Sequence, residues 1–418
     1  MSKFVIRGGG RLEGEIDVQG AKNAVLPILA ATILNGEKNV IYNCPELRDV
    51  KITIEVLKDL GCRVKRQGRI LVVESDNISD CKIADELMRQ MRSSIIFLGA
   101  IISRCKKAVV SMPGGCEIGN RPIDLHLKAL KKLGVEITEA HGYINCEAPN
   151  LHGDNIQLDF PSVGATENIM LAACMADGVT VVNNAAREPE IVDLAMFLNR
   201  MGAKISGAGT DVIRIEGVQK LYGVEHTIMP DRIVAATYLA AAAVTGGSII
   251  LRNADPSHMS AMIHALKDMG CRIYSEKSRL ILNAPHNGLK NADKLQTMPY
   301  PGFPTDIQSP FMALAAVADG TTMFVENIFE NRYQHVEELI RMGADIKVDG
   351  RVAVVQGVPR LSGANVVAKE LRGGAALVIA GLAADGITEI ENIKYIDRGY
   401  EAIEKYLSVC GADIRREE

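Results

Sequence analysis

The chain has 418 residues, 47% of them hydrophobic, and a formal net charge of −4 at pH 7. A chain of this length can bury a large core and favours two domains. Nucleic-acid-binding proteins usually carry a basic surface or stacking aromatics, whereas this chain is net acidic, has only 4% aromatic residues and lacks Trp. Nucleic acid is therefore not an expected partner.

Export, membrane insertion and metal binding also lack sequence signals. Residues 1–17, MSKFVIRGGGRLEGEID, have no apolar signal-peptide core, and apolar runs such as Tyr238 to Val244 are too short to span a bilayer. The nine cysteines are scattered, without a CxxC pair or ligand-like spacing to His, which indicates free thiols. HExxH, GxxxxGK[ST] and GxGxxG motifs are absent. We therefore expect a cytoplasmic protein with no membrane association, no metal and no nucleotide cofactor.

In chain order, a phrase of amphipathic helix, Gly, strand, turn and strand recurs six times. It appears first as VLKDLGCRVKRQGRILVVE and last as YLSVCGADIRREE. The glycines that end its helices recur about every 70 residues, a regularity that is hard to obtain by chance, and Gly is the usual residue after a helix C-terminus. These glycines are Gly61, Gly134, Gly202, Gly270, Gly343 and Gly411.

A second, more apolar helix followed by a strand lies upstream of each phrase. Examples are AVLPILAATIL before NVIYN and AATYLAAAAVTGG before SIILRN. These Ala-rich helices have little polar face, so we expect them to be buried on nearly all sides. The predicted fold is α/β, a two-domain inside-out α/β barrel of six βαβαββ-type repeats, with pseudo-threefold symmetry in each domain.

The six repeats divide most naturally into three and three near residue 229. The first predicted domain, residues 21–229, carries repeats one to three and the loop around Cys116. The second combines residues 1–20 with residues 230–418, because the strand Lys3 to Arg7 is expected to return to the end of the chain. Two chain crossings make a hinge plausible, and we expect the active site in a cleft between the domains.

The stretch Met112 to Leu125, MPGGCEIGNRPIDL, has the composition of an active-site lid. Adjacent glycines place Cys116 at a loop tip, and Arg121 offers a planar fork of donors suited to phosphate or carboxylate. Pro122 and Asp124 suit the first turn of the following helix. The alternative is that Cys116 is a small buried hydrophobic residue, the commoner role of a single Cys.

Polar residues also recur where each repeat should begin its apolar helix. Helix N-termini favour anions, so basic residues there suggest phosphate or carboxylate binding, and Asp306 is a candidate proton acceptor. A helix cap or a surface ion pair is the alternative for each of them. The positions are Lys22–Asn23, Arg92, Ser162–Val163–Gly164, Asp231–Arg232, Asp306 and Arg372.

Three further arginines lie on connections equivalent to the Cys116 loop. Arg398 is in YIDRGYE, and the others are in the segments REPE (187–190) and FENRY (329–333). In a chain of negative net charge, such a gathering of arginines would focus positive charge locally. We expect it to line a pocket for an anionic ligand.

Several strings in the chain resemble the UDP-N-acetylglucosamine 1-carboxyvinyltransferases of the EPSP synthase family. They are QGAKNAVLPIL, PGGCEIGNRPIDLH, SVGATENIM, NAAREPEIVDLA, FPTDIQ and YIDRGYE, and they extend from the first strand to the last repeat. The resemblance implies transfer of an enolpyruvyl group from phosphoenolpyruvate to the 3'-hydroxyl of UDP-N-acetylglucosamine through a tetrahedral intermediate. Phosphate is released, no cofactor is used, and no obligate protein partner is implied. This is the first committed step of peptidoglycan biosynthesis.

The resemblance also implies roles for individual residues. Cys116 would protonate the methylene carbon of phosphoenolpyruvate and can form a covalent adduct with it, and Asp306 would accept the proton of the sugar hydroxyl. Lys22, Arg121 and Arg398 would hold the phosphate, and Arg372 the carboxylate. The residues implied at the UDP-sugar are Asn23, Arg92, Arg121, Pro122, Ile123, Asp124, Leu125, Ser162, Val163 and Ile328.

Two departures from the family pattern and two alternative functions remain. Glu370 stands where the family commonly has Asp, which puts a proton-relay role for that acid in doubt, and Phe160–Pro161 replaces a more polar pair. A shikimate-type transferase is disfavoured by Cys116 and the RPIDL segment. A non-catalytic paralogue that binds the UDP-sugar and regulates a partner is disfavoured by the intact acid and base.

Overall fold

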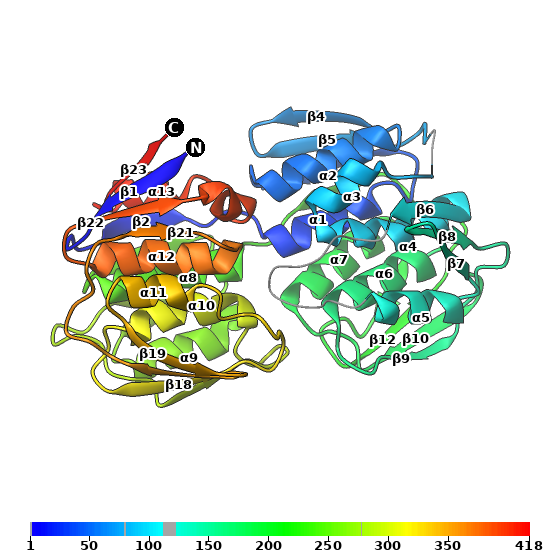
Figure 1. The fold of residues 1–418 in the computed structure, drawn as a ribbon. Coiled ribbons are helices and arrows are strands. Elements are labelled where there is room, and N and C mark those ends of the chain that lie inside the picture. The colour runs from blue at the N-terminus through cyan, green and yellow to red at the C-terminus, as the bar shows by residue number, and fades with distance from the viewer. Residues whose placement is uncertain (1, 79–80, 112–122, 277) are drawn as a thin grey trace. The chain divides into compact units, whose positions relative to one another are not determined.

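The computed structural model describes residues 2–78, 81–111, 123–276 and 278–418. The chain forms two compact units (Figure 1). The described part of the C-terminal unit lies within residues 2–19 and 230–418, and that of the N-terminal unit within residues 20–111 and 123–229. Most of the predicted lid, including Cys116, Arg121 and Pro122, lies outside the described residues.

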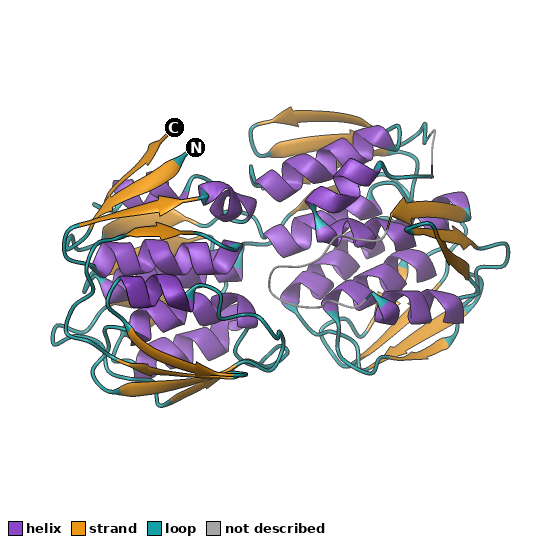
Figure 2. Ribbon diagram, in the orientation of Figure 1, coloured by secondary structure: helices purple, strands orange, loops and turns teal. Residues whose placement is uncertain are grey.

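Three apolar helices pack against one another in the centre of the C-terminal unit. They are α8 (Arg232–Val244), α10 (Thr305–Ala315) and α12 (Leu371–Ala383). Every residue of α8 up to Ala243 is buried, as predicted for a helix without a polar face. Figure 2 shows helices inside this unit and strands at its outside, which confirms the inside-out arrangement.

Three four-stranded sheets surround these helices in the part of the unit that the structure describes. Their strand orders are β15-β16-β14-β2, β17-β18-β20-β19 and β21-β22-β1-β23. Each sheet contains one parallel pair and two antiparallel pairs. The strands are β1 (Lys3–Arg7), β2 (Glu13–Asp17), β14 (Ser248–Arg252), β15 (Arg272–Glu276), β16 (Arg279–Asn283), β17 (Lys294–Gln296), β18 (Thr321–Val325), β19 (Asp345–Asp349), β20 (Val352–Gln356), β21 (Asn365–Val367), β22 (Ile387–Glu391) and β23 (Asp413–Glu417).

The two N-terminal strands pair with strands that come more than 200 residues later in the chain. β1 pairs antiparallel with both β22 and β23, and in Figure 1 this blue strand lies beside the red strand β23. β2 pairs parallel with β14 and supplies the first strand of the fourth repeat. The shorter helices of the unit are η2 (Pro256–Met259), α9 (Ser260–Asp268), α11 (Val336–Arg341), η3 (Ile393–Arg398) and α13 (Ile403–Val409).

The N-terminal unit repeats the same plan. Its central helix α4 (Phe97–Cys105) packs against both α1 (Lys22–Ala31) and α6 (Val163–Ala173). The other helices are α2 (Arg48–Asp59), α3 (Asp85–Gln90), η1 (Arg92–Ile96), α5 (Asp124–Lys132) and α7 (Pro189–Arg200). α3 and the 3₁₀ turn η1 were not predicted; the repeat pattern only put Arg92 where the first helix of the second repeat should begin.

The sheets of the N-terminal unit have the orders β13-β3-β5-β4, β11-β12-β10-β9 and β6-β8-β7. In the three-stranded sheet, Lys82 forms an isolated parallel bridge with Val109 where the other repeats have a fourth strand. The strands are β3 (Lys38–Tyr42), β4 (Arg63–Gln67), β5 (Ile70–Glu74), β6 (Lys107–Ser111), β7 (Glu136–Ala140), β8 (Tyr143–Glu147), β9 (Asn155–Gln157), β10 (Val179–Asn183), β11 (Lys204–Ser206), β12 (Val212–Glu216) and β13 (Glu225–Thr227).

All six predicted helix-ending glycines have positive φ angles, which confirms them as C-terminal caps. The angles are 101° at Gly61, 84° at Gly134, 103° at Gly202, 95° at Gly270, 96° at Gly343 and 96° at Gly411. Among the described residues, none of the helices combines the length and apolarity needed to cross a membrane.

We expect Gly343→Ala to lower the free energy of unfolding by about 1–2 kcal/mol, the cost of holding an L-residue in a left-handed conformation. No atom lies within 4 Å of the position that its Cβ would take, so backbone strain is the whole effect. The midpoint of urea unfolding measures the change. Gly10→Ala is the matched control: the φ of Gly10 is not positive, and its Cβ would make an ordinary contact at 3.6 Å. Equal midpoints for both variants would contradict the prediction.

Candidate active site

The central helices of the C-terminal unit begin with charged residues that interact. Arg372, in the first turn of α12, places Nη2 3.2 Å from Oδ2 of Asp306 in the first turn of α10. Asp231 is the N-cap of α8, and its carboxylate accepts hydrogen bonds from the amides of Ile233 and Val234. Asp231 also attracts the Arg372 guanidinium electrostatically. The N-termini of the three helices therefore meet at Arg372.

Two buried arginines flank Asp306. Nη2 of Arg332 lies 3.1 Å from Oδ1 of Asp306, so each carboxylate oxygen faces a different guanidinium. The side chain of Asp306 is 28% exposed, while Arg332 and Arg372 are buried. Burial acts to lower the pKa of Arg372, but Asp306, Tyr400 and Asp231 together outweigh burial, so the pKa is raised. Asp306 is thus a fixed, partly accessible carboxylate, the arrangement that a proton acceptor needs.

Glu370 has a structural role in this cluster. It is the N-cap of α12, and its carboxylate accepts hydrogen bonds from the amide of Arg372 at 2.7 Å and from the amide of Gly373. Its Oε2 atom also lies 3.7 Å from Nη1 of Arg332. Arg332 is the arginine of the FENRY segment that we expected near an anionic ligand, and it instead faces the carboxylates of Asp306 and Glu370 within its own unit.

His335 follows Arg332 by three residues and is buried beside it. Burial and the positive charge of Arg332 lower the pKa of His335 to about 3, so the imidazole is neutral at pH 7. In the unfolded chain the imidazole has its ordinary pKa and takes up a proton well before the folded protein does. The folded protein therefore becomes less stable as the pH falls below the ordinary pKa of His, about 6.5.

We expect the free energy of unfolding to fall as the pH is lowered from about 6.5 towards 3, by up to about 1.4 kcal/mol per pH unit from His335 alone. His335→Gln cannot titrate, so its stability should depend less steeply on pH over this range. Urea unfolding of both proteins at several pH values between about 7 and 4 measures the difference. Parallel pH dependences would show that His335 does not titrate between the folded and unfolded states as described.

The turn that carries Ile328 is tied to the start of α10. Glu326 is buried, and its Oε1 atom accepts hydrogen bonds from the amides of Ile328 (2.8 Å) and Phe329 (3.0 Å). Its Oε2 atom accepts a hydrogen bond from the hydroxyl of Thr305 at 3.0 Å. The half-buried Ile328 is thereby held next to the residue that precedes Asp306.

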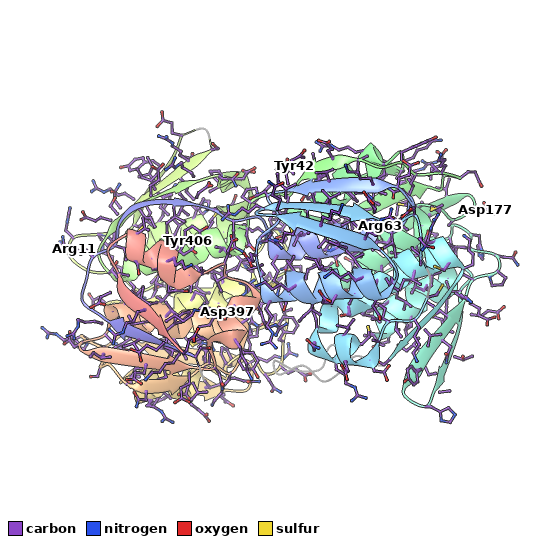
Figure 3. The ribbon with its side chains drawn as sticks, turned by 90° about the horizontal axis from the view of Figure 1, so that it is seen from above. Arg11, Tyr42, Arg63, Asp177, Asp397 and Tyr406 are labelled. Atoms are coloured by element: carbon purple, nitrogen blue, oxygen red, sulfur yellow. The ribbon has the colours of Figure 1, made fainter. Side chains whose placement is uncertain are left out.

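Arg398 ends η3 and is half-buried. The preceding residue, Asp397 (Figure 3), forms a bidentate pair with Arg416 of β23, at 2.6 and 2.9 Å. Hydrogen bonding to Asp397 and Glu404 raises the pKa of Arg416. The segment that carries Arg398 is therefore anchored to the edge strand of its own sheet.

In the N-terminal unit, Lys22 opens α1 and is nearly buried. Its Nζ atom lies 2.9 Å from Oδ2 of Asp49 in α2, and the two side chains are 11% and 1% exposed. A buried ammonium needs such a partner, because an uncompensated charge is costly away from water. Asn23, the next residue, is half-buried.

The other predicted residues of this unit that the structure describes lie at or beside helix starts. Ser162 caps α6, its hydroxyl accepting from the amide of Ala165 at 3.3 Å, and Val163 is the first residue of that helix. Asp124 opens α5 and is exposed, while Ile123 and Leu125 are half-buried. Arg92 opens η1.

A buried pair of side chains connects α5, α6 and η1. His126 of α5 lies 2.7 Å from Nδ2 of Asn168 in α6, and that amide also donates to the carbonyl of Ile95 in η1 at 3.0 Å. Oδ1 of Asn168 accepts from the amide of Gly99 at 2.7 Å. The structure thus brings together the regions of Arg92, Asp124 and Ser162. In the described ranges, no group of three or more His, Cys, Asp or Glu side chains is placed to hold a metal ion.

Comparison with known proteins identifies the family. The sequence model of the EPSP synthase (3-phosphoshikimate 1-carboxyvinyltransferase) family matches residues 6–407. The chain is 56% identical over 416 residues to UDP-N-acetylglucosamine 1-carboxyvinyltransferase 2 of Caldanaerobacter subterraneus, with 100% of both chains covered. It is 49% identical to UDP-N-acetylglucosamine 1-carboxyvinyltransferase of Geobacter metallireducens, over 100% of this chain and 99% of that one.

The fold is also shared with solved structures. The enolpyruvyl transferase NikO from Streptomyces tendae superimposes with a TM-score of 0.91 at 24% identity, over 99% of this chain and 98% of that one. EPSP synthase from Acinetobacter baumannii has a TM-score of 0.76 at 19% identity, over 100% of both chains. The chain therefore belongs to the EPSP synthase family and, within it, to the UDP-N-acetylglucosamine 1-carboxyvinyltransferases.

Proposed function

We propose that this protein transfers the enolpyruvyl group of phosphoenolpyruvate to the 3'-hydroxyl of UDP-N-acetylglucosamine and releases phosphate. The observation that carries the proposal is the 56% identity over the full length to a relative named for this transfer. The reaction is the first committed step of peptidoglycan biosynthesis. Its two substrates, phosphoenolpyruvate and UDP-N-acetylglucosamine, are small molecules. A cytoplasmic location fits it, because the eight cysteines in the described ranges form no disulfide, as is usual in a reducing compartment.

The proposed chemistry needs one proton acceptor and one proton donor. Asp306 would take the proton of the sugar hydroxyl while the hydroxyl oxygen bonds to C2 of phosphoenolpyruvate, and the thiol of Cys116 would give its proton to C3. The tetrahedral intermediate still carries the phosphate. Loss of phosphate from C2 and of one proton from C3 then restores the double bond and gives the enol ether.

The cations of the chain would hold the charges of phosphoenolpyruvate. We assign the phosphate to Lys22, Arg121 and Arg398, because fixed cations favour its departure as an anion. We assign the carboxylate to Arg372, whose guanidinium carries five N–H donors and uses Nη2 towards Asp306. These roles fall on residues of both units.

The UDP-sugar would be bound mainly by the N-terminal unit. Most of the described residues with this proposed role lie in or beside α5, α6 and η1, the three elements that His126 and Asn168 connect. We assign it to Asn23, Arg92, Arg121, Pro122, Ile123, Asp124, Leu125, Ser162 and Val163, with Ile328 from the C-terminal unit.

Phosphate release from phosphoenolpyruvate tests the proposal, with either UDP-N-acetylglucosamine or shikimate 3-phosphate as acceptor. We expect release only with the UDP-sugar. Release with shikimate 3-phosphate alone would favour the shikimate-type alternative. Tight binding of the UDP-sugar without release would favour a non-catalytic paralogue.

A further inference from the structure

Gln19 is the last residue of the N-terminal segment of the C-terminal unit, and it is buried at 2% exposure. Its Nε2 atom donates a hydrogen bond to the carbonyl of Gly399 at 3.2 Å, and its Oε1 atom accepts one from the amide of Glu401 at 2.8 Å. Its own carbonyl accepts a hydrogen bond from the amide of Asp231 at 2.9 Å. One side chain thus holds residues 398–401, here called the Arg398 segment, against the residues that lead into α8.

The Arg398 segment has little regular structure of its own to fix it. It begins with the last residue of η3 and precedes Ala402, whose φ of +44° is left-handed, before α13 begins. On its N-terminal side, Asp397 is anchored to Arg416 at 2.6 Å. On its C-terminal side, the two hydrogen bonds of Gln19 are the corresponding anchor.

The Arg398 segment packs directly against the start of α12. The ring centroid of Tyr400 lies 5.5 Å from the guanidinium carbon of Arg372, and the Tyr400 hydroxyl lies 2.9 Å from Oγ1 of Thr237 in α8. A Cβ atom at Gly399 would lie 2.9 Å from the side chain of Leu371 and 3.5 Å from Nη1 of Arg372. A shift of the segment therefore moves both Arg398 and the surface against which Arg372 rests.

We propose that Gln19 is a positioning residue for phosphoenolpyruvate, acting through the Arg398 segment on Arg398 and Arg372. The inference rests on the proposed function, which assigns these arginines to the phosphate and the carboxylate. Gln19 does not touch the substrate. Its two hydrogen bonds to Gly399 and Glu401 hold the segment that carries Arg398. Through Gly399 and Tyr400, the same segment supports Arg372.

Steady-state kinetics of Gln19→Met in the full-length protein tests the inference. Met fills a similar volume but makes neither hydrogen bond, and the loss of two buried hydrogen bonds should raise the KM for phosphoenolpyruvate about tenfold or more. The KM for UDP-N-acetylglucosamine should stay within about twofold of the wild-type value, because that ligand is assigned mainly to the N-terminal unit. A uniform structural weakening would raise both KM values alike and would overturn the inference.

Asn35→Leu is the matched control. Asn35 is also a buried amide that bridges backbone groups, donating to the carbonyl of Tyr222 at 2.8 Å and accepting from the amide of Glu37 at 2.9 Å, but it lies in the N-terminal unit. It should lose stability without a selective rise in the KM for phosphoenolpyruvate. A selective rise in this control as large as that of Gln19→Met would also overturn the inference.

Tyr400→Phe carries the same test if Gln19→Met does not fold. It removes the hydroxyl that lies 2.9 Å from Oγ1 of Thr237 and that also interacts with Arg372, and a smaller rise in the same KM is expected; no rise would overturn the inference. Wild-type protein that releases no phosphate would refute the proposed function, and the inference with it. Active wild-type protein with an unchanged KM in the folded variants would refute the inference alone.

Discussion

Asp306→Asn is expected to lower kcat by about 10²–10⁴, the usual contribution of a general base. Asn keeps the shape of the side chain and can still accept a hydrogen bond, but it cannot take the proton of the sugar hydroxyl. Because the amide occupies the same place between Arg332 and Arg372, binding of UDP-N-acetylglucosamine should change far less than kcat. Initial rates and calorimetric binding of the UDP-sugar measure the two quantities separately.

Asp306→Asn should also lower the free energy of unfolding. It removes the negative charge that faces two buried guanidinium groups at 3.1 and 3.2 Å. Removing one partner of a fully buried pair costs about 3–5 kcal/mol, and we expect less here because Asp306 is partly exposed and Glu370 still faces Arg332. Asp385→Asn is the control, since Asp385 pairs with Arg360 at the surface, where ion pairs contribute about 0–1 kcal/mol. A kcat of Asp306→Asn within about threefold of the wild-type value would exclude Asp306 as the proton acceptor.

Cys116→Ala is expected to lower kcat by a similar factor of about 10²–10⁴, because it removes the proposed proton donor to C3. Cys116→Asp should retain much more activity, since a carboxylic acid can also give a proton to carbon. Phosphate release in the presence of both substrates measures each variant. Full activity of Cys116→Ala would refute the assignment.

Alkylation of the wild-type protein should inactivate it through the same residue. Burial raises the pKa of Cys62 to about 11 and those of Cys146, Cys174 and Cys271 to about 12, so these thiols contain little of the reactive thiolate near neutrality. Peptide mapping after brief treatment should find Cys116 modified first. Cys105→Ala, which removes a half-buried thiol elsewhere, should be as active and as sensitive as the wild type.

The repeat architecture could be predicted from the sequence because its signals are local. A glycine after an amphipathic helix and a mainly apolar helix before a strand are patterns within about 20 residues, and they recur along the chain. The 3₁₀ turn η1 before α4 and the additional helix α3 carried no such pattern. They occur in the one repeat that has an isolated bridge in place of a fourth strand.

The partners of the site residues could not be predicted, because tertiary packing brings them together over long separations. Lys22 meets Asp49 across 27 residues, Arg372 meets Asp306 across 66, and Gln19 meets Gly399 across 380. No local pattern distinguishes Asp49 or Gln19 from an ordinary polar residue. Their roles follow only from burial and from the atoms that they face.

Some of the polar residues predicted at helix starts are helix caps, and others are not. Ser162 and Asp231 cap α6 and α8 with their side chains. Asp306 stands at the equivalent place in α10, but the N-cap there is Pro304, and the carboxylate of Asp306 turns to the arginines instead. Polar residues at helix starts therefore either cap the helix or form ion pairs with other helices. Only the contacts in the structure tell the two roles apart.

The most direct test of the proposed transfer is a mass spectrum of the product formed from phosphoenolpyruvate and UDP-N-acetylglucosamine in D₂O. Because Cys116 exchanges its proton with solvent, protonation of C3 followed by loss of a proton from the resulting methyl group should leave deuterium in the methylene group of part of the enolpyruvyl product. Product without deuterium would contradict addition followed by elimination. Absence of the product would contradict the proposed function itself.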